Sequence, residues 1–263
     1  MLINVGRMFF GFFLDIVFSN DPLRISQVFI GKRCQFVWEK EHVGRKIILK
    51  MFESRETKYF TENIKKDDVC FDVGANVGYY ANLFSSLVGC DGKVVAIEPV
   101  SRNVRLIQLA SSLNKTEDIL NIVCAGASDE DAKFYISTEG DSSYASVQSE
   151  RVTAAEMIEC RKLDTLCDEL GIVKIDILKM DIEGWEYHAL LGMEGILADS
   201  QRRPRLMMIE LFSKYLNKYS SSIDEVCSYL SQFGYVSSVL DGKGDLIPFR
   251  KEHHDKIYNV FFR

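Results

Sequence analysis

From residue 67 onward, short apolar runs alternate with longer segments in which apolar residues recur at the helical period. The apolar runs are predicted to be strands, because uninterrupted runs of about four to eight such residues are typical of strands buried on both faces. The predicted strands are 69–73, 93–97, 120–125, 175–180 and 206–211, and the predicted helices are 79–88, 102–114, 164–170 and 185–191. This alternation predicts βαβ units and an α/β fold with a mostly parallel sheet and helices on both faces.

Three regions depart from this alternation. Residues 1–66 are predicted to form an N-terminal helical and β extension, with an apolar helix at 8–18, β-like runs at 35–38 and 46–50, and a helix at 54–63. Residues 130–162 are predicted to be a β-hairpin-like insertion, with strands near 133–136 and 157–161. In the C-terminal part, the residue pattern predicts a helix at 221–233. An antiparallel pair of strands, 236–240 and 257–262, is predicted to follow it at the edge of the sheet.

Composition and charge limit the class of protein. A chain of 263 residues can form one sizeable α/β core but no second full domain. The net charge is −6 and the basic residues are scattered, which argues against a nucleic-acid partner, because such binding requires a basic surface. The seven cysteines are an odd number without a Cys-x-x-Cys pair, so we expect neither a disulfide framework nor a zinc site, and a reducing, cytoplasmic location.

The apolar segment 8–18 is eleven residues long and contains Asp15, whereas a membrane-spanning helix needs about 20 apolar residues. No small-x-small cleavage site follows it, so a signal peptide is not expected. We predict a helix that packs on the core or on a second copy of the chain. Contact with a membrane surface is the less favoured alternative, because the polar face lacks lysines and arginines.

The first predicted strand ends in Asp72, and the loop that follows has Gly74 and Gly78 four residues apart. Such a loop lets a ligand approach bare backbone at the start of a helix. A dinucleotide fingerprint requires glycines at the first, third and sixth positions, which are here Gly74, Asn76 and Tyr79. The spacing therefore favours S-adenosylmethionine over a nicotinamide cofactor. Asn76 can replace a middle glycine, because Asn adopts left-handed backbone conformations at low cost.

Polar residues also follow the second and third strands. Glu98 would present two free carboxylate oxygens as acceptors for a ribose diol. The third strand is followed by small residues at 125–127, which would let an adenine lie flat, with Ser128 or Asp129 near its edge. An ordinary turn explains the same residues equally well.

The fourth strand carries Lys179 and, two residues on, Asp181, which therefore point to the same face. A buried charge is costly unless it is paired, so the pair is either a structural ion pair or part of a reacting site. We favour catalysis for Asp181 and a structural role for Lys179. Glu183 and Glu210 lie at the same rim, but no dense set of oxygen ligands follows them, so no metal is predicted. His188 is expected to be a surface or satisfied core histidine.

Four sequence features occur together in order: Asp-Val-Gly-Ala-Asn-Val-Gly-Tyr at 72–79, Glu-Pro at 98–99, Leu-Asp at 163–164, and Leu-Lys-Met-Asp-Ile-Glu-Gly at 178–184. From residue 67 to 212 the chain thus resembles the FkbM family of S-adenosylmethionine-dependent methyltransferases. The resemblance implies a class I methyltransferase (Rossmann-like) domain over 67–263, with a seven-stranded, mostly parallel sheet whose last strand is antiparallel. It also implies methylation of a hydroxyl group on a carbohydrate, small molecule or secondary metabolite.

On this interpretation the acceptor is a small molecule or glycan and S-adenosyl-L-methionine is the cofactor. The predicted cofactor-binding residues are Asp72, Gly74, Asn76, Gly78, Tyr79, Glu98, Ser128 and Asp129. The predicted catalytic residues are Asp181, as the base, with Glu183 and Glu210 behind it. Two alternatives stay open at this point, a nicotinamide-dependent oxidoreductase and a non-catalytic cofactor-binding protein.

Overall fold

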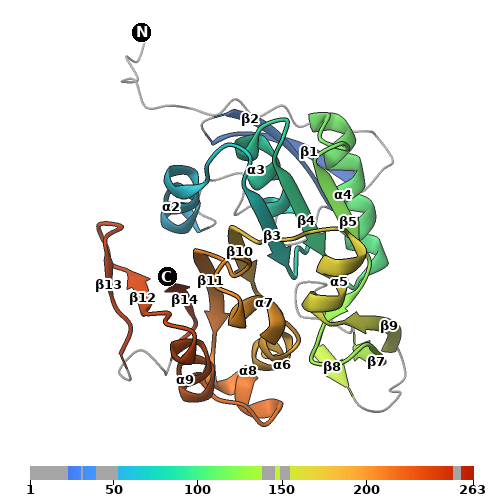
Figure 1. Ribbon diagram of the computed structural model, residues 1–263. Coiled ribbons are helices and arrows are strands. Elements are labelled where there is room, and N and C mark those ends of the chain that lie inside the picture. The colour runs from blue at the N-terminus through green and yellow to red at the C-terminus, as the bar shows by residue number, and fades with distance from the viewer. Residues whose placement is uncertain (1–22, 31, 40–52, 138–145, 149–154, 251–255) are drawn as a thin grey trace, which may run out of the picture.

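A twisted, mostly parallel sheet forms the centre of the molecule (Figure 1). The computed structural model describes residues 23–30, 32–39, 53–137, 146–148, 155–250 and 256–263. The strands of the central sheet are β3 (Val69–Val73), β4 (Lys93–Ile97), β5 (Leu120–Val123), β10 (Ile177–Met180), β11 (Leu206–Leu211), β12 (Ser237–Leu240), β13 (Leu246–Pro248) and β14 (Tyr258–Phe262). Their spatial order is β13-β12-β14-β11-β10-β3-β4-β5.

The strands β5, β4, β3, β10 and β11 are parallel, and β14 runs antiparallel to both β11 and β12. The predicted α/β fold with an antiparallel last strand is thereby confirmed. The strand count is eight rather than seven in the described part of the chain. The added strand is β13, which forms because a turn closed by hydrogen bonds between Asp241 and Asp245 returns the chain along β12. The predicted antiparallel pair therefore exists, but β14 lies inside the sheet and β13 forms its edge.

Helices cover both faces of the sheet (Figure 1). One face carries α2 (Ser54–Asn63), α3 (Tyr79–Val88) and α4 (Ser101–Asn114). The other carries α5 (Leu163–Glu169), α6 (Glu186–Leu191), α7 (Glu194–Ala198), α8 (Ser213–Lys218) and α9 (Ile223–Gln232).

Alternate side chains of each strand feed one of two apolar cores, because successive residues of a strand point to opposite faces. In β3, Phe71 and Val73 join the α5–α9 core, whereas Cys70 joins the α2–α4 core. In β10, Leu178 and Met180 point to the α5–α9 side. The same alternation places Asp72 and Lys179, which are register partners, on the α3 side of the sheet.

The described part of the N-terminal extension packs on α3 and α4. Its strands β1 (Leu23–Ile30) and β2 (Lys32–Glu39) form an antiparallel pair. The backbone of Gln35 exchanges two hydrogen bonds of 2.7 Å with the Asn114 side chain, and Phe36 stacks on Tyr79. The predicted helix at 54–63 is confirmed as α2. The predicted segments 8–18 and 46–50 lie outside the described residues, and the boundary at residue 66 stays a prediction.

A second, smaller sheet follows β5. Its strands are β6 (Gly126–Ala127), β7 (Ala132–Ser137), β8 (Ser146–Gln148) and β9 (Ala155–Arg161), in the order β6-β9-β7-β8. The predicted strands near 133–136 and 157–161 are confirmed as the antiparallel pair β7 and β9. This sheet places apolar side chains of β7 and β9 beside the carboxyl ends of the central strands.

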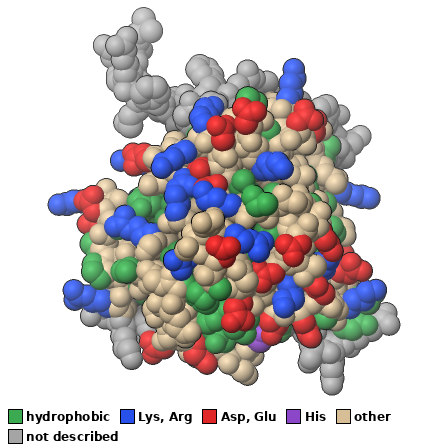
Figure 2. Space-filling model, in the orientation of Figure 1, with side chains coloured by type: hydrophobic (Ala, Val, Ile, Leu, Met, Phe, Trp, Pro, Cys, Tyr) green, Lys and Arg blue, Asp and Glu red, His purple; other side chains and the backbone are tan. Residues whose placement is uncertain are grey.

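Lys and Arg side chains are interspersed with Asp and Glu over the face shown in Figure 2. None of the helices in the described ranges is both long enough and apolar enough to cross a membrane. None of the seven cysteines, all of which lie in the described ranges, forms a disulfide bond.

Candidate active site

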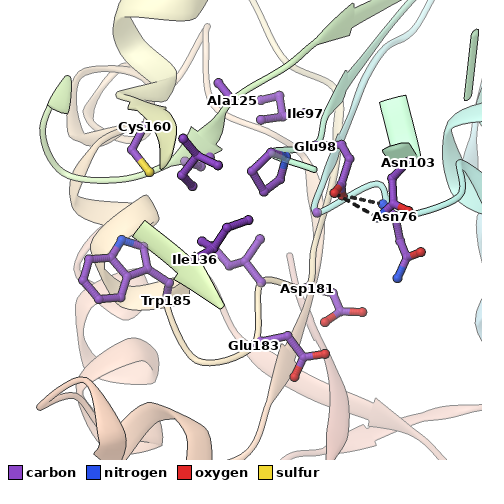
Figure 3. A pocket seen from close by; sticks show the side chains of 16 residues that line it. Asn76, Ile97, Glu98, Asn103, Ala125, Ile136, Cys160, Asp181, Glu183 and Trp185 are labelled. Atoms are coloured by element: carbon purple, nitrogen blue, oxygen red, sulfur yellow. Dashed lines mark hydrogen bonds between the residues drawn. The ribbon is translucent and has the colours of Figure 1, made fainter. Parts of the chain in front are cut away.

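A pocket opens at the carboxyl ends of β3, β4 and β10, where ligands of open α/β sheets bind (Figure 3). One wall carries Glu98 with Asn76 and Asn103, and an adjoining wall carries Asp181 and Glu183 (Figure 3). The lining residues are Gly74, Asn76, Ile97, Glu98, Pro99, Asn103, Ala125, Gly126, Ala127, Ile136, Ile158, Cys160, Asp181, Ile182, Glu183 and Trp185.

The loop after β3 requires glycine at its first position. Gly74 has φ +76°, and a Cβ there would lie 1.9 Å from the carbonyl oxygen of Asp181. The loop after β3 thus packs directly against the backbone of the loop after β10. Asn76 adopts the predicted left-handed conformation, with φ +50°. The loop is therefore held against the loop after β10, and its Gly74 and Asn76 line the pocket.

Glu98 is buried, with 4% of its surface exposed, yet it lines the pocket. Its Oε2 accepts a hydrogen bond of 2.8 Å from the Asn76 amide, and its Oε1 accepts from the Val100 amide and the Asn103 side chain. Burial raises the pKa of Glu98 to about 7, although these hydrogen bonds oppose the increase. The prediction that both oxygens are free was wrong, because the loop folds back over the strand end. A carboxylate oxygen can accept two hydrogen bonds. Because Oε2 accepts one from the protein, it can accept another from a ligand hydroxyl.

Small and apolar residues form the other end of the pocket. Residues 125–127 line this end, and a Cβ at Gly126 would lie 2.7 Å from the Cys160 sulfur. Trp185 and Ile136 border the same end (Figure 3). Most of the side chains at this end are small or apolar, whereas Glu98 and Asn103 are the polar groups beside it.

Ser128 and Asp129, predicted to lie at the adenine edge, do not line the pocket. The buried Ser128 hydroxyl donates to Asp129 and accepts a hydrogen bond of 3.2 Å from the Trp185 indole. Asp129 Oδ2 lies 3.4 Å from Nδ1 of His188, whose ring stacks on Trp185. The two residues therefore hold Trp185 in place from behind, and His188 is a partnered histidine, as expected.

Asp72 and Tyr79 also lie behind the pocket wall rather than in it. Asp72 is 1% exposed, and its Oδ2 accepts a hydrogen bond of 2.8 Å from the Ala81 amide at the start of α3. The Tyr79 hydroxyl shares a hydrogen bond of 2.9 Å with Thr57. Both residues hold α3 and the glycine loop in position.

The buried Lys179 ammonium joins the walls of the site. It donates a hydrogen bond of 3.2 Å to the Gly74 carbonyl and lies 3.5 Å from Asp72 Oδ1 and 3.6 Å from Asp181 Oδ2. Burial alone would lower the pKa of Lys179, but the surrounding carboxylates raise it above the usual value. Lys179 therefore remains charged and fixes Asp181 relative to the loop after β3.

Carboxylates outnumber cations around Lys179. Burial raises the pKa of Glu183 to about 8, with further increases from Asp181 and Glu186. Burial also raises the pKa of Glu210, and repulsion from Asp181 and Glu183 adds to it. The three predicted catalytic carboxylates thus lie close enough to affect one another, although only Asp181 and Glu183 line the pocket. No group of metal-ligating side chains suited to a metal ion occurs among the described residues.

The turn after β10 also depends on Glu186, which the sequence analysis did not single out. Glu183 and Gly184 both have positive φ, and a Cβ at Gly184 would lie 2.6 Å from the backbone of Tyr215. The buried Glu186 carboxylate accepts hydrogen bonds from the amides of Ile182 and Gly184. The motif Ile-Glu-Gly-Trp-Glu at 182–186 is therefore a structural turn that aims Glu183 at the pocket.

Asn103 and Trp185 were also missed as pocket residues. Asn103 lies in the first turn of the helix after Glu98, and Trp185 follows directly after the Gly184 turn. Asn103 lies close to the Glu-Pro motif at 98–99, and Trp185 directly follows the motif at 178–184. This closeness to predicted ligand-facing loops was the signal that could have identified both as pocket residues.

The chain is similar in sequence to a methyltransferase family and to one characterised protein. The sequence model described as the Methyltransferase FkbM domain matches residues 72–237, which include the strand ends of the central sheet up to β11. The AMB antimetabolite synthetase AmbE of Pseudomonas aeruginosa is 23% identical over an alignment of 239 positions, which covers 76% of this chain. The chain spans 11% of that relative's length.

Two solved structures are also similar. An FkbM methyltransferase from Methylobacillus flagellatus KT is 17% identical with a TM-score of 0.48, over 75% of this chain and 44% of the other. A precorrin-6y C5,15-methyltransferase from Geobacter metallireducens GS-15 is 11% identical with a TM-score of 0.48, over 86% of this chain and 93% of the other.

Proposed function

Because the chain belongs to the FkbM family of S-adenosylmethionine-dependent methyltransferases, we propose that it methylates a hydroxyl group of a carbohydrate or other small molecule. The observation that carries this proposal is one pocket with two unlike walls. A buried, hydrogen-bonded Glu98 lines it together with a pair of carboxylates, Asp181 and Glu183, from the adjoining loop. The first wall suits the hydroxyls of a cofactor, and the second suits a proton leaving an acceptor. Family membership sets aside the nicotinamide-dependent alternative.

The chain's own residues would bind and orient the cofactor. Glu98 is proposed to accept hydrogen bonds from the ribose hydroxyls, because Oε2 has a single protein donor. The backbone of Gly74 and Asn76 is proposed to contact the methionine part, and residues 125–127 with Trp185 the adenine. S-adenosylmethionine supplies, when bound, a methyl group on a positively charged sulfur. Gly78, Tyr79 and Asp72 are proposed to act indirectly, by shaping the loop.

Asp181 is proposed to accept the proton of the acceptor hydroxyl. Its side chain is 29% exposed, it lines the pocket, and Lys179 fixes its Oδ2. Alignment of two reactants can supply up to ~7–11 kcal/mol of the barrier. A positioned base adds roughly 10²–10⁴-fold. Glu183 and Glu210, whose pKa values are raised, are proposed to hold protons near neutral pH and to exchange them with Asp181.

Cofactor identity is tested by thermal unfolding. A ligand that binds only the folded state, at 100 times its dissociation constant, stabilises it by ~2.7 kcal/mol. S-adenosylhomocysteine should therefore raise the melting temperature by several degrees, and NAD should leave it unchanged. Stabilisation by NAD alone would overturn the proposal.

The role of Asp181 is tested with Asp181→Asn, which keeps the shape but removes the charge. Once an acceptor is found, turnover should fall by roughly 10²–10⁴-fold with S-adenosylhomocysteine affinity nearly unchanged. If Asp181 served only as the structural partner of Lys179, the variant would instead lose ~3–5 kcal/mol of stability. The exposed Asp118→Asn is the matched control. Normal turnover in the Asp181 variant would remove Asp181 from the reaction.

A further inference from the structure

Glu53 brings a carboxylate to the site from the segment that precedes the family match, which begins at residue 72. It lies directly before α2, has φ +40°, and accepts a hydrogen bond of 2.8 Å from the Thr57 amide through its carbonyl oxygen. Phe60 of α2 packs against the rings of Tyr80 and Phe84, with centroid distances of 5.5 and 5.0 Å. These contacts hold Glu53 in a fixed position over the sheet.

A chain of contacts leads from Glu53 to the pocket. The Tyr80 hydroxyl donates a hydrogen bond to Glu53 Oε2, and Tyr80 is 3% exposed. The face of the Tyr80 ring lies 5.6 Å from the Lys179 ammonium, measured to the ring centroid. Lys179 in turn lies 3.6 Å from Asp181 Oδ2. Each step is an ordinary interaction, and together they connect the N-terminal extension to the proposed base.

Glu53 also interacts electrostatically with the charged groups around Lys179. Burial raises the pKa of Glu53, whereas the Tyr80 hydrogen bond and the Lys179 charge lower it. The negative charge of Glu53 in turn raises the pKa of both Lys179 and Glu210. The groups that face this cluster are Asp72 from β3, Tyr80 from α3, Lys179 from β10, Asp181 and Glu183 from the turn after β10, Glu210 from β11, and Asn259 from β14.

We propose that Glu53 is a positioning residue for methyl transfer, which orients Tyr80 and Lys179 and through Lys179 holds Asp181 toward the acceptor. The proposal rests on the proposed function of the same pocket. It assigns a role in the reaction to a residue outside the matched family region. Removal of the Glu53 charge should also let Glu210 ionise at lower pH, because a nearby like charge disfavours ionisation.

The test compares Glu53→Gln with Glu62→Gln in the full chain. Glu62 is an exposed residue on α2 and serves as the control. The titration of Glu210 is followed by carbon-13 NMR of the carboxyl groups, with its signal assigned by its loss in Glu210→Gln. We expect its midpoint to fall by roughly 0.5–1 pH unit in Glu53→Gln, below the ~1–3 units of adjoining charges, because Lys179 offsets part of the repulsion. Glu62→Gln should not move it.

Two further measurements separate a positioning role from a structural one. Affinity for S-adenosylhomocysteine should stay within about threefold of wild type, whereas kcat with an acceptor should fall at least about tenfold at constant KM for the cofactor. Glu53→Asp should recover part of kcat. If Glu53→Gln does not fold, Tyr80→Phe removes the donor, keeps the ring, and should lower kcat in the same way.

An unchanged Glu210 titration together with unchanged kcat would overturn the role of Glu53. Failure of the wild-type chain to bind S-adenosylhomocysteine would instead overturn the proposed function. The two failures are thus distinguishable, because the NMR titration requires neither cofactor nor acceptor.

Discussion

Glu98 and Glu183 line different walls of one pocket, and burial raises the pKa of both, but their surroundings differ. Glu98 accepts three hydrogen bonds from the protein, which hold its pKa near 7. Glu183 lies among other carboxylates, and their repulsion helps to raise its pKa to about 8. A carboxylate surrounded by donors is fixed and suits binding, whereas one surrounded by like charges gains and loses protons readily and suits acid–base chemistry.

The two walls also differ in how they are held. The Glu98 wall is built from backbone amides and a glycine loop within a short stretch of chain. The Asp181 wall is held by the Lys179 ammonium, which joins residues far apart in sequence. Substitutions on the two walls should therefore fail in different ways.

The largest effect is expected for Lys179→Met. This change leaves the buried Asp72 carboxylate without its counter-ion, so the free energy of unfolding should fall by ~3–5 kcal/mol near pH 8. The loss should be smaller in mild acid, because protonation of Asp72 relieves it. Urea unfolding near pH 8 and in mild acid measures the free energy of unfolding under the two conditions. Lys58→Met, whose side chain is 72% exposed, should change stability by less than about 0.5 kcal/mol; an equally small loss in Lys179→Met would remove the ion-pair account.

A somewhat smaller effect is expected for Gly74→Ala in the loop of the Glu98 wall. The added Cβ meets the Asp181 carbonyl at 1.9 Å in a left-handed conformation, so roughly 2–4 kcal/mol of stability should be lost, together with cofactor binding.

Alanine substitutions at two other glycines separate the cost of a left-handed backbone from the cost of a steric clash. Gly171→Ala has the same sign of φ but open space around it, and should cost only about 1 kcal/mol. Gly242→Ala has open space and no positive φ, and should be nearly neutral. A Gly74→Ala variant no worse than Gly171→Ala in thermal unfolding would show that the two loops do not touch.

The smallest effect is expected for Glu183→Gln. The folded-state pKa of Glu183, about 8, lies above its ordinary value of 4.5, so the folded form retains a proton that the unfolded chain has lost. Wild-type stability should therefore fall as pH rises through this window. Because Glu183 is partly exposed, the Gln variant should remove only on the order of 1–2 kcal/mol of this decrease. The exposed Glu159→Gln should keep the wild-type slope, and a Glu183 variant with that slope would refute the raised pKa.

The sequence predicted the features that depend on neighbouring residues. The strand and helix around residues 69–88, the left-handed Asn76 and the Glu98 position follow from local spacing and backbone preference. The edge strand β13 was missed because a three-residue strand ending in Pro248 gives almost no apolar pattern.

The directions of the side chains at the site were harder to predict from the sequence than the positions of the strands and loops. Ser128 and Asp129 follow the third predicted strand, but their side chains turn toward Trp185 and His188 rather than the pocket. The spacing of residues could not reveal this choice of hydrogen-bond partners. Glu53 lies 128 positions before Asp181 in the chain, and only folding of the extension brings it near Lys179. Long-range contacts of this kind leave no periodic signal in a single sequence.

The division of the pocket into a binding wall and a reacting wall is tested most directly by calorimetric titration of S-adenosylhomocysteine into Glu98→Ala and Asp181→Asn, beside wild type. Glu98→Ala removes the acceptor of three protein hydrogen bonds and of the proposed ribose contact, so affinity should fall at least about tenfold, or ~1.4 kcal/mol. Asp181→Asn should bind within about threefold of wild type. Full affinity in Glu98→Ala with lost affinity in Asp181→Asn would contradict the account.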